Sequence, residues 1–462
     1  MTNKLVAVGI ALFALMIVIV IIFYAMSKGN STSTTKTTTN KNDKITLTVW
    51  RTFDEDVSFK QLLENFAIDN PNIVINYVKK DLADYEVQAI NSLAAGTGPD
   101  IWSINNQWIP RHIDKIVPMP EDFIKTKKDS RSNTDFYKQT YAKVAQNDSI
   151  IDNKVYAMPM YVDTLALYVN TQLWDEARNN YRKQFYSDPN FDDSLFRRYP
   201  STWEELLKEL PYLTKKDSAG NITQSGIAMG ASTNIDNSAD ILSLLMLQNS
   251  TKMTDDTRQS ARFNNFVPDA SNKPVYPGTN ALDFYTSFAL KSKSNYSWSS
   301  SMPNAYQSFI NGKVAMLVGY QHVVQSLKQD APTLMYEVSY MPQVKGGETT
   351  NFANYWTETV TNNCKNPSEA WKFLQYITMR PNSYLSSTRR SSALLGDPTI
   401  PISYDVFPDQ VQTALTWNMG KYPDDMNKIF RDMITNVVAN NQPPQQAIDS
   451  AAALATDALQ KD

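Results

Sequence analysis

The chain has 462 residues and a formal net charge of −3, with 42% hydrophobic and 20% charged residues. This composition is typical of a globular protein, and without a basic stripe it argues against nucleic acid as a partner. The single cysteine, Cys364, excludes an internal disulfide, and with only two histidines the usual metal-ligand spacings are absent.

The N-terminal segment predicts a membrane anchor. Residues 5–26 are an apolar run without a charge, and as a helix about 33 Å long they would cross a bilayer core of about 30 Å. A cleaved signal peptide is the alternative, but its apolar stretch is usually about 7–15 residues long. We therefore expect a short cytoplasmic end (1–4), an uncleaved transmembrane helix (5–26) and a linker rich in Ser, Thr, Asn and Lys (27–44).

Alternating strands and helices follow the linker. Residues 45–51 alternate and are rich in β-branched side chains, which predicts a strand, and 57–70 place apolar side chains on one helical face. A strand at 73–78, a helix at 85–95 and a strand at 100–104 complete a β-α-β-α-β order. This order indicates a mostly parallel sheet covered by helices, and in such sheets ligands bind beyond the carboxyl ends of the strands.

The second half of the chain continues as an α/β mixture without an internal repeat. A turn followed by a helix is predicted at 199–213, with Ser201 or Thr202 as the N-cap. The other predicted elements are strands at 226–230 and 314–318 and helices at 304–311, 366–379, 424–438 and 444–459.

Six segments of the chain occur in a recognisable order. They read ITLTVWRTFDED, AAGTGPDIWSINNQWIP, VYAMPMYVDTLALYVNTQLW, YPSTWEELLKEL, FINGKVAMLVGYQHVV and NYWTETVTNNCKNPSEAWKFLQYIT. In this order they resemble the family 1 extracellular solute-binding proteins of ABC importers, the maltose-binding type. The resemblance covers nearly all of residues 45–459. No single motif is diagnostic, but the ordered set is specific. Family members are typically lipoproteins or cleaved periplasmic proteins, so the expected helical anchor departs from the family pattern.

The resemblance implies an α/β fold of two lobes, the type II periplasmic-binding-protein fold, with hinge crossovers and a ligand enclosed in the cleft between the lobes. It implies that lobe 1 comprises residues 45–158 plus 352–394 and lobe 2 comprises 159–351 plus 395–462. Counting basic residues around the anchor would place the globular part in the cytoplasm. The resemblance instead implies the extracytoplasmic side of the cell membrane, a single-pass topology, and ABC permease subunits as partners. We expect a monomer that needs no cofactor.

A sugar site needs flat aromatic surfaces for the apolar faces of the rings and polar side chains for the hydroxyl groups. Both kinds occur together at predicted strand ends and crossings. The candidate ligand-binding residues are Phe53, Asp54, Asn105, Asn106, Trp108, Tyr161, Asp163, Thr233, Tyr320, Gln321, Tyr355, Trp356, Arg390 and Trp417. Most other aromatic residues must pack in the core or on the surface. Trp50, Trp102, Trp174, Trp203 and Trp371 fit such positions better, and we assign His112 and His322 structural roles.

Two other function classes remain open alternatives. A glycoside hydrolase would need a pair of carboxylates whose separation a sequence does not show. The chain has no GxSxG, HExxH or GxxxxGK[ST] motif, and we predict no catalytic residue. A surface sensor or adhesion receptor could reuse the same fold, since fold alone does not fix use. The sequence favours a non-enzymatic receptor for a small ligand, with an oligosaccharide as the first candidate; peptides, polyols and sugar phosphates are the alternatives.

Overall fold

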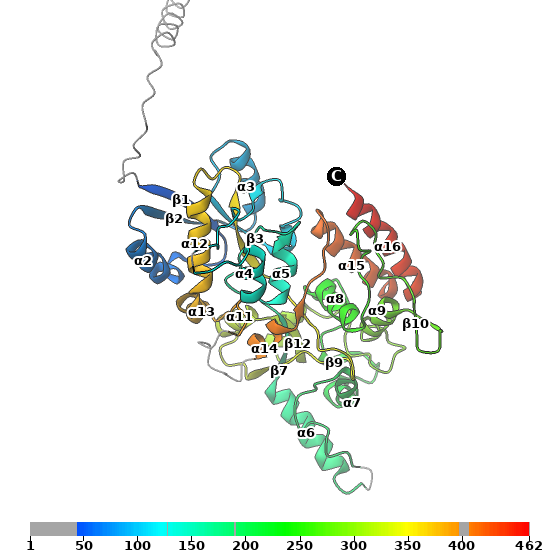
Figure 1. The fold of residues 1–462 in the computed structure, drawn as a ribbon. Helices are drawn as coiled ribbons and strands as arrows, with labels where there is room; N and C mark the ends of the chain where they lie inside the picture. Colours follow the sequence, from blue (N-terminus) through cyan, green and yellow to red (C-terminus); the bar gives the residue numbers. More distant parts are fainter. Residues whose placement is uncertain (1–43, 127, 189–190, 397–405, 462) are drawn as a thin grey trace, which may run out of the picture. The chain divides into compact units, whose positions relative to one another are not determined.

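The computed structural model describes residues 44–126, 128–188, 191–396 and 406–461 (Figure 1). The predicted transmembrane helix at 5–26 and nearly all of the predicted linker lie outside these residues. Within the described part of the chain, no helix is both long and apolar enough to cross a membrane. Residues 45–462 form one compact unit, which is described below.

Lobe 1 is built on a five-stranded sheet with the strand order β2-β1-β3-β15-β4. Its first three strands are parallel, as the predicted β-α-β-α-β order requires, whereas β15 returns from late in the chain and runs antiparallel to β3. Helices α3 and α12 lie close to this sheet in Figure 1. The strands are β1 (Ile45–Arg51), β2 (Ile73–Lys79), β3 (Ile101–Asn105), β4 (Ile116–Val117) and β15 (Trp356–Thr361).

The helices of lobe 1 follow the predicted pattern with one break. The helix predicted at 57–70 is divided into a 3-10 turn, η1 (Asp56–Ser58), and α2, because residue 59 closes the turn before α2 begins. The helices are α2 (Lys60–Asp69), α3 (Tyr85–Ala94), η2 (Asn106–Trp108), α4 (Asn133–Thr140), α5 (Lys143–Ser149), α12 (Pro367–Met379) and α13 (Asn382–Thr388), with the short hairpin β5 (Ile150–Ile151) and β6 (Lys154–Val155).

Lobe 2 is built on a second five-stranded sheet with the order β13-β7-β12-β9-β8. Every residue of β7 and β12 is buried, as expected for central strands covered on both faces. The strand predicted at 226–230 ends earlier, because the chain turns at Met229 and Gly230 adopts φ +103° against the backbone of Ala289. The strands are β7 (Leu165–Asn170), β8 (Lys215–Lys216), β9 (Ile222–Ile227), β12 (Val314–Tyr320) and β13 (Tyr336–Ser339).

The C-terminal helices belong to the core of lobe 2. Met426, Phe430 and Ile448 pack in the same hydrophobic cluster as strands β7 and β12, and Figure 1 shows α15 and α16 beside α8 and α9. The helices are α6 (Thr171–Phe185), α7 (Trp203–Leu213), α8 (Ser238–Gln248), α9 (Pro277–Ser287), α10 (Ala305–Ile310), α11 (Val323–Asp330), α14 (Val406–Gln412), α15 (Pro423–Val438) and α16 (Pro444–Gln460). The remaining short strands are β10 (Val267–Pro268), β11 (Pro274–Val275), β14 (Asn351–Phe352) and β16 (Ala414–Leu415).

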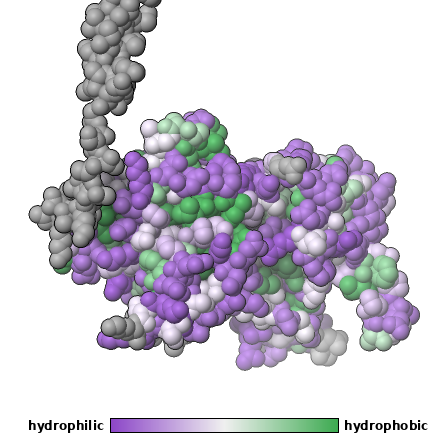
Figure 2. Space-filling model, turned by 45° about the horizontal axis from the view of Figure 1, so that its top comes forward, coloured by the Kyte–Doolittle hydropathy of each residue, from purple (hydrophilic) through white to green (hydrophobic). Residues whose placement is uncertain are grey.

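The two largest of three hydrophobic clusters in the described residues show where the chain passes between the lobes. Val162 packs in the core of lobe 1 and Leu165 in that of lobe 2, so the first core extends past the predicted limit at residue 158. On the return, Phe352 packs in lobe 2 and Ala353 in lobe 1. Most of the surface seen in Figure 2 is polar, with smaller separate areas of apolar side chains, as expected for a solvated domain.

Helix α7 begins with a capping box at Thr202, one of the two predicted N-caps. The Thr202 hydroxyl accepts the amide N–H of Glu205 at 3.2 Å, and the Glu205 carboxylate accepts the amide N–H of Thr202 at 3.3 Å. Replacing a capping Thr by Ala costs about 1 kcal/mol. We expect Thr202→Ala to lower the free energy of unfolding by that amount, as measured by urea unfolding. Thr223→Ala, which removes an exposed hydroxyl on β9, should lose less, and equal losses would contradict a capping role.

Candidate functional site

The edges of the two sheets meet where the chain crosses between the lobes. Residue pairs Thr164–Ala353 and Tyr161–Ser392 form isolated β-bridges between the crossing segments. The carboxyl ends of β1 and β3 in lobe 1 and of β12 in lobe 2 lead into this region, which is where α/β sheets bind ligands. We call this region the sheet-edge site.

Three segments cross between the lobes, near residues 161–164, 353–354 and 391–394, and Asp163 and Gln321 hold them together. The buried Asp163 carboxylate accepts the amide N–H of Gln321 at 2.6 Å and lies 3.1 Å from Nδ1 of His322. The Asp163 carbonyl oxygen accepts the amide N–H of Asn354 at 3.0 Å. Gln321 in turn accepts hydrogen bonds from both the amide and the hydroxyl of Ser391 at 3.0 Å. The end of β12 is therefore fixed against all three crossing segments.

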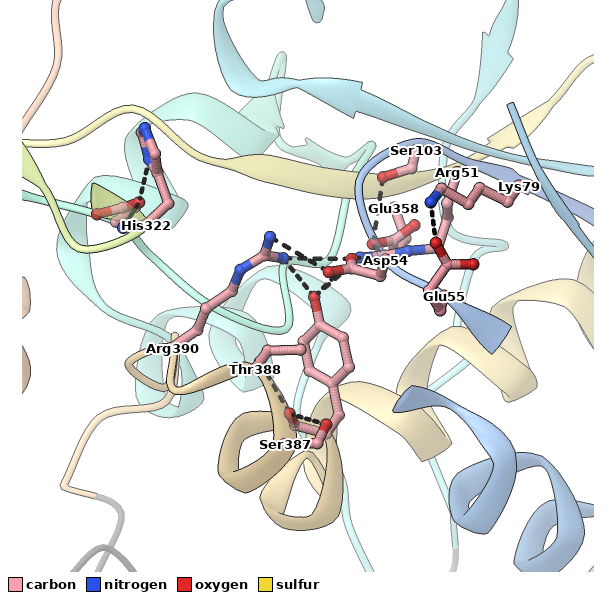
Figure 3. Close-up of polar contacts among 12 residues, drawn as sticks. Arg51, Asp54, Glu55, Lys79, Ser103, His322, Glu358, Ser387, Thr388 and Arg390 are labelled. Carbon is pink, nitrogen blue, oxygen red and sulfur yellow. Dashed lines mark hydrogen bonds and ion pairs between the residues drawn. The ribbon is translucent and has the colours of Figure 1, made fainter. Parts of the chain in front are cut away.

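A buried network of charged groups lies on the lobe 1 side, as Figure 3 shows. Arg51, at the end of β1, donates to Asp54 at 2.9 Å and also to Glu358 of β15. Tyr384 of α13 donates to Asp54 at 3.0 Å, and Arg390 approaches the same carboxylate at 3.3 Å. Two cations thus face two carboxylates, which is the pairing that buried charges require.

The two carboxyl groups of this network have opposite pKa shifts. Burial by itself raises the pKa of Asp54, but Arg51 and Arg390 together outweigh it, and this pKa lies below its ordinary value. Burial dominates at Glu358 and raises its pKa despite the contact with Arg51. Asp54 is therefore the firmly ionised member, and its charge holds Arg390 over the ring of Tyr161 at 4.1 Å.

Three aromatic side chains form a partly exposed cluster beside this network. The ring of Trp356 lies 5.2 Å from that of Phe53 and 5.3 Å from that of Trp108, both in edge-on contacts. Phe53 is 50% exposed and has φ +39°, a left-handed conformation that is uncommon for a bulky residue and is often found at functional sites. Next to the cluster, Asn105 donates to the side-chain oxygen of Asn354 at 2.6 Å.

Lobe 2 contributes a carboxylate, Asp240, that is not among the residues predicted from the sequence. Tyr320, at the end of β12, donates its hydroxyl to Asp240 of α8 at 2.7 Å. Burial raises the pKa of Asp240 to about 6, against the opposing effects of Tyr320, Arg431 and Asn354. In the sequence, the one sign of this group is a single acidic residue in the first turn of a largely apolar helix, SADILSLLMLQ.

Three predicted site residues lie beside Asp148 and not at the sheet-edge site: Asn106, Tyr355 and Trp417. The side chains of Asn106 and Tyr355 donate to Asp148 of α5 at 2.9 and 2.8 Å, and Thr416 donates to the same carboxylate. Burial raises the pKa of Asp148 although all three donors oppose the shift. Asp148 lines a cavity of about 580 Å³ between the lobes, together with Asn106 and Trp417.

Backbone alternation explains this division of the predicted residues. Neighbouring side chains of an extended chain point to opposite faces. Trp356 and Asn105 therefore join the sheet-edge site, whereas the side chains of Tyr355 and Asn106 bond Asp148. Thr233 is exposed on the loop after β9, and no contact among the described residues joins it to either group.

The remaining assignments concern tryptophans and histidines. Trp50, Trp102, Trp174, Trp203 and Trp371 are buried, which confirms their core positions. His112 is buried and bonded to Glu86 at 2.7 Å, consistent with a structural role, whereas His322 is exposed beside Asp163. No group of three metal-ligating side chains occurs among the described residues.

Comparison with known proteins identifies the family. The family model for bacterial extracellular solute-binding proteins matches residues 52–380. A Brucella abortus protein named as a binding protein is 22% identical over 334 residues, covering 69% of this chain and 68% of its own length.

Solved structures show the same fold. The sugar-binding protein MalE of Xanthomonas citri has a TM-score of 0.69 at 17% identity, covering 90% of this chain and 97% of its own. The cyclic alpha-maltosyl-1,6-maltose binding protein of Arthrobacter globiformis has a TM-score of 0.70 at 16% identity, covering 90% and 99%. Both share the fold of this chain over about nine-tenths of its length. The matched family consists of solute-binding proteins and not of enzymes. The chain therefore belongs to the bacterial extracellular solute-binding protein family.

Proposed function

We propose that this protein captures an oligosaccharide at the sheet-edge site between its lobes and delivers it to an ABC permease. The observation that carries the proposal is the half-exposed cluster of Phe53, Trp108 and Trp356 beside the amide pair of Asn105 and Asn354. Aromatic rings offer the apolar surface that pyranose faces need, and amides offer both donors and acceptors for hydroxyl groups. The names of the two similar solved structures, both sugar-binding proteins, support the same ligand class.

Site residues from both lobes take part in this proposal. From lobe 1 we assign Phe53, Asn105, Trp108 and Trp356 to direct ligand contact. Asp54, Tyr161, Asp163, Gln321 and Arg390 hold the crossings and orient the contact residues. Tyr320 faces the site from lobe 2, and we assign the exposed Thr233 to ligand contact in the closed form. Asn106 and Trp417 line the Asp148 cavity and Tyr355 bonds Asp148, and we assign all three to lobe packing instead.

We further propose that residues 5–26 anchor the protein in the cell membrane, with residues 45–462 as a monomeric receptor on the extracytoplasmic side. A random coil of 18 residues has a root-mean-square span of about 25 Å, and a linker of that span would keep the receptor near a membrane-bound permease. The apolar run and the polar linker composition support this arrangement.

Thermal unfolding of residues 45–462 against maltotetraose, mannotriose, polyols and peptides tests the proposed function. A ligand present at 100 times its dissociation constant adds about 2.7 kcal/mol to the free energy of unfolding, and the midpoint should rise. We expect at least one oligosaccharide to raise it and to be recovered unchanged. A response to peptides alone would remove the carbohydrate assignment, and consumption of the sugar would contradict a binding protein.

A further inference from the structure

Asp240 stands out among the residues of lobe 2. It is the one charged residue of α8, a helix whose other side chains are almost all buried. Its own side chain remains partly exposed in the first turn of the helix. A carboxylate in this position costs stability, because burial disfavours its charged form.

The contacts of Asp240 connect it to the sheet-edge site. The hydroxyl of Tyr320 donates to Oδ2 of Asp240 at 2.7 Å. Asn354 of the second crossing also hydrogen-bonds to it, and the oxygen of Asn354 accepts from Asn105 of lobe 1 at 2.6 Å. A continuous polar chain therefore runs from the aromatic cluster of lobe 1, through Asn354, to Asp240 of lobe 2.

Among the described residues, two charged or titratable groups act on Asp240. Tyr320 approaches from β12 and Arg431 from α15, while Asn354 contributes a neutral amide. Asp163 also acts on Tyr320, and the ring of His322 stacks on that of Tyr320 at 5.9 Å. Because burial outweighs the help from Arg431 and the two hydrogen bonds, the pKa of Asp240 is about 6, and the group changes charge near neutral pH.

We propose that Asp240 is a ligand-binding residue of the sheet-edge site, whose carboxylate accepts hydrogen bonds from sugar hydroxyl groups. Tyr320 and Asn354 hold the carboxylate in place for this contact. The inference rests on the proposed function, since it requires a hydroxyl-rich ligand between the lobes. An ionised carboxylate accepts hydrogen bonds at both oxygens, whereas the protonated acid gives up one acceptor for a donor.

This role makes ligand affinity depend on pH in one direction. If the sugar needs the ionised form, then protonation of Asp240 competes with binding. With a pKa of about 6, roughly one-tenth of the protein carries the ionised group at pH 5 and nearly all of it at pH 8. We therefore expect affinity to be about tenfold weaker at pH 5 than at pH 8.

Calorimetric titration with maltotetraose and mannotriose at pH 5 and pH 8 tests the proposal in three proteins. The wild type should show the tenfold difference. Asp240→Asn should bind weakly at both pH values, with the difference lost. Glu209→Gln is the control, because it removes another buried carboxyl of lobe 2 that touches no site residue. Burial raises the pKa of Glu209 to about 7, and this variant should bind as the wild type does at both pH values.

Thermal unfolding without ligand separates a binding role from a structural one. An Asn at position 240 still accepts from Tyr320 and carries no buried charge, so its midpoint at pH 8 should equal or exceed that of the wild type. A lowered midpoint, or an unchanged pH difference in Asp240→Asn, would overturn the role of Asp240 while leaving the receptor intact. No binding by the wild type at either pH would instead overturn the oligosaccharide assignment and this inference with it.

Discussion

Replacing Arg51 by Met should destabilise residues 45–462 by about 3–5 kcal/mol, the cost of removing one partner from a buried ion pair. Arg51 is 3% exposed and donates to both Asp54 and Glu358, which are themselves buried. Without the guanidinium, two carboxylates face only Arg390, and Glu358 is left without a cation in contact. Urea unfolding followed by tryptophan fluorescence measures the loss.

The control for this experiment is Lys79→Met. Lys79 pairs with Glu55, but both side chains are largely exposed, at 40% and 66%. Exposed pairs of this kind contribute less than about 1 kcal/mol. If Arg51→Met and Lys79→Met caused similar small losses, the network in Figure 3 would not be the structural centre of the lobe 1 edge.

Replacing Phe53 by Ala should weaken binding of a responding oligosaccharide about tenfold, which corresponds to roughly 1.4 kcal/mol. An aromatic contact contributes about 0.5–1.5 kcal/mol beyond the area it buries. Because Phe53 is half exposed and sits at a positive φ, its removal should leave the free energy of unfolding nearly unchanged. Calorimetric titration and urea unfolding together measure both quantities.

Phe266 provides the matched control for the aromatic contact. It is 58% exposed and lies beside the β10–β11 hairpin of lobe 2, where it packs on Tyr276 and not on the sheet-edge site. Phe266→Ala should bind the sugar as the wild type does. Equal affinities of Phe53→Ala and the wild type would place the ligand away from the aromatic cluster.

The sequence predicted the order of elements better than the grouping of site residues. Periodicity locates β1, α12 and α15 because their burial repeats along the chain. It misplaced β9, since the packing of Gly230 against Ala289 is a contact between distant segments. The same limit applies to η1, where a local turn interrupts an amphipathic pattern.

The predicted site residues fall into two groups, because the direction of a side chain, and not its type, decides which residues it contacts. Asn105 and Asn106 are identical in type and adjacent, yet one bonds Asn354 and the other Asp148. In the same way, Tyr355 bonds Asp148, whereas the adjacent Trp356 packs on Phe53 and Trp108. The sequence does not identify Asp240 for a related reason. One acidic residue in an apolar helix indicates a site only when its neighbour in space, Tyr320, is known.

The central claim is that a sugar is enclosed between two lobes, and a distance measured across the sheet-edge site tests it directly. Spin labels at Val57, just after β1, and Lys328, on α11 after β12, stand on opposite lobes at exposed positions. With Cys364 replaced by Ser, electron–electron double resonance gives their separation with and without the responding oligosaccharide. We predict a shorter distance when the sugar is bound, because hinge closure brings the two sheet edges together. A bound sugar that leaves the distance distribution unchanged would contradict enclosure between the lobes.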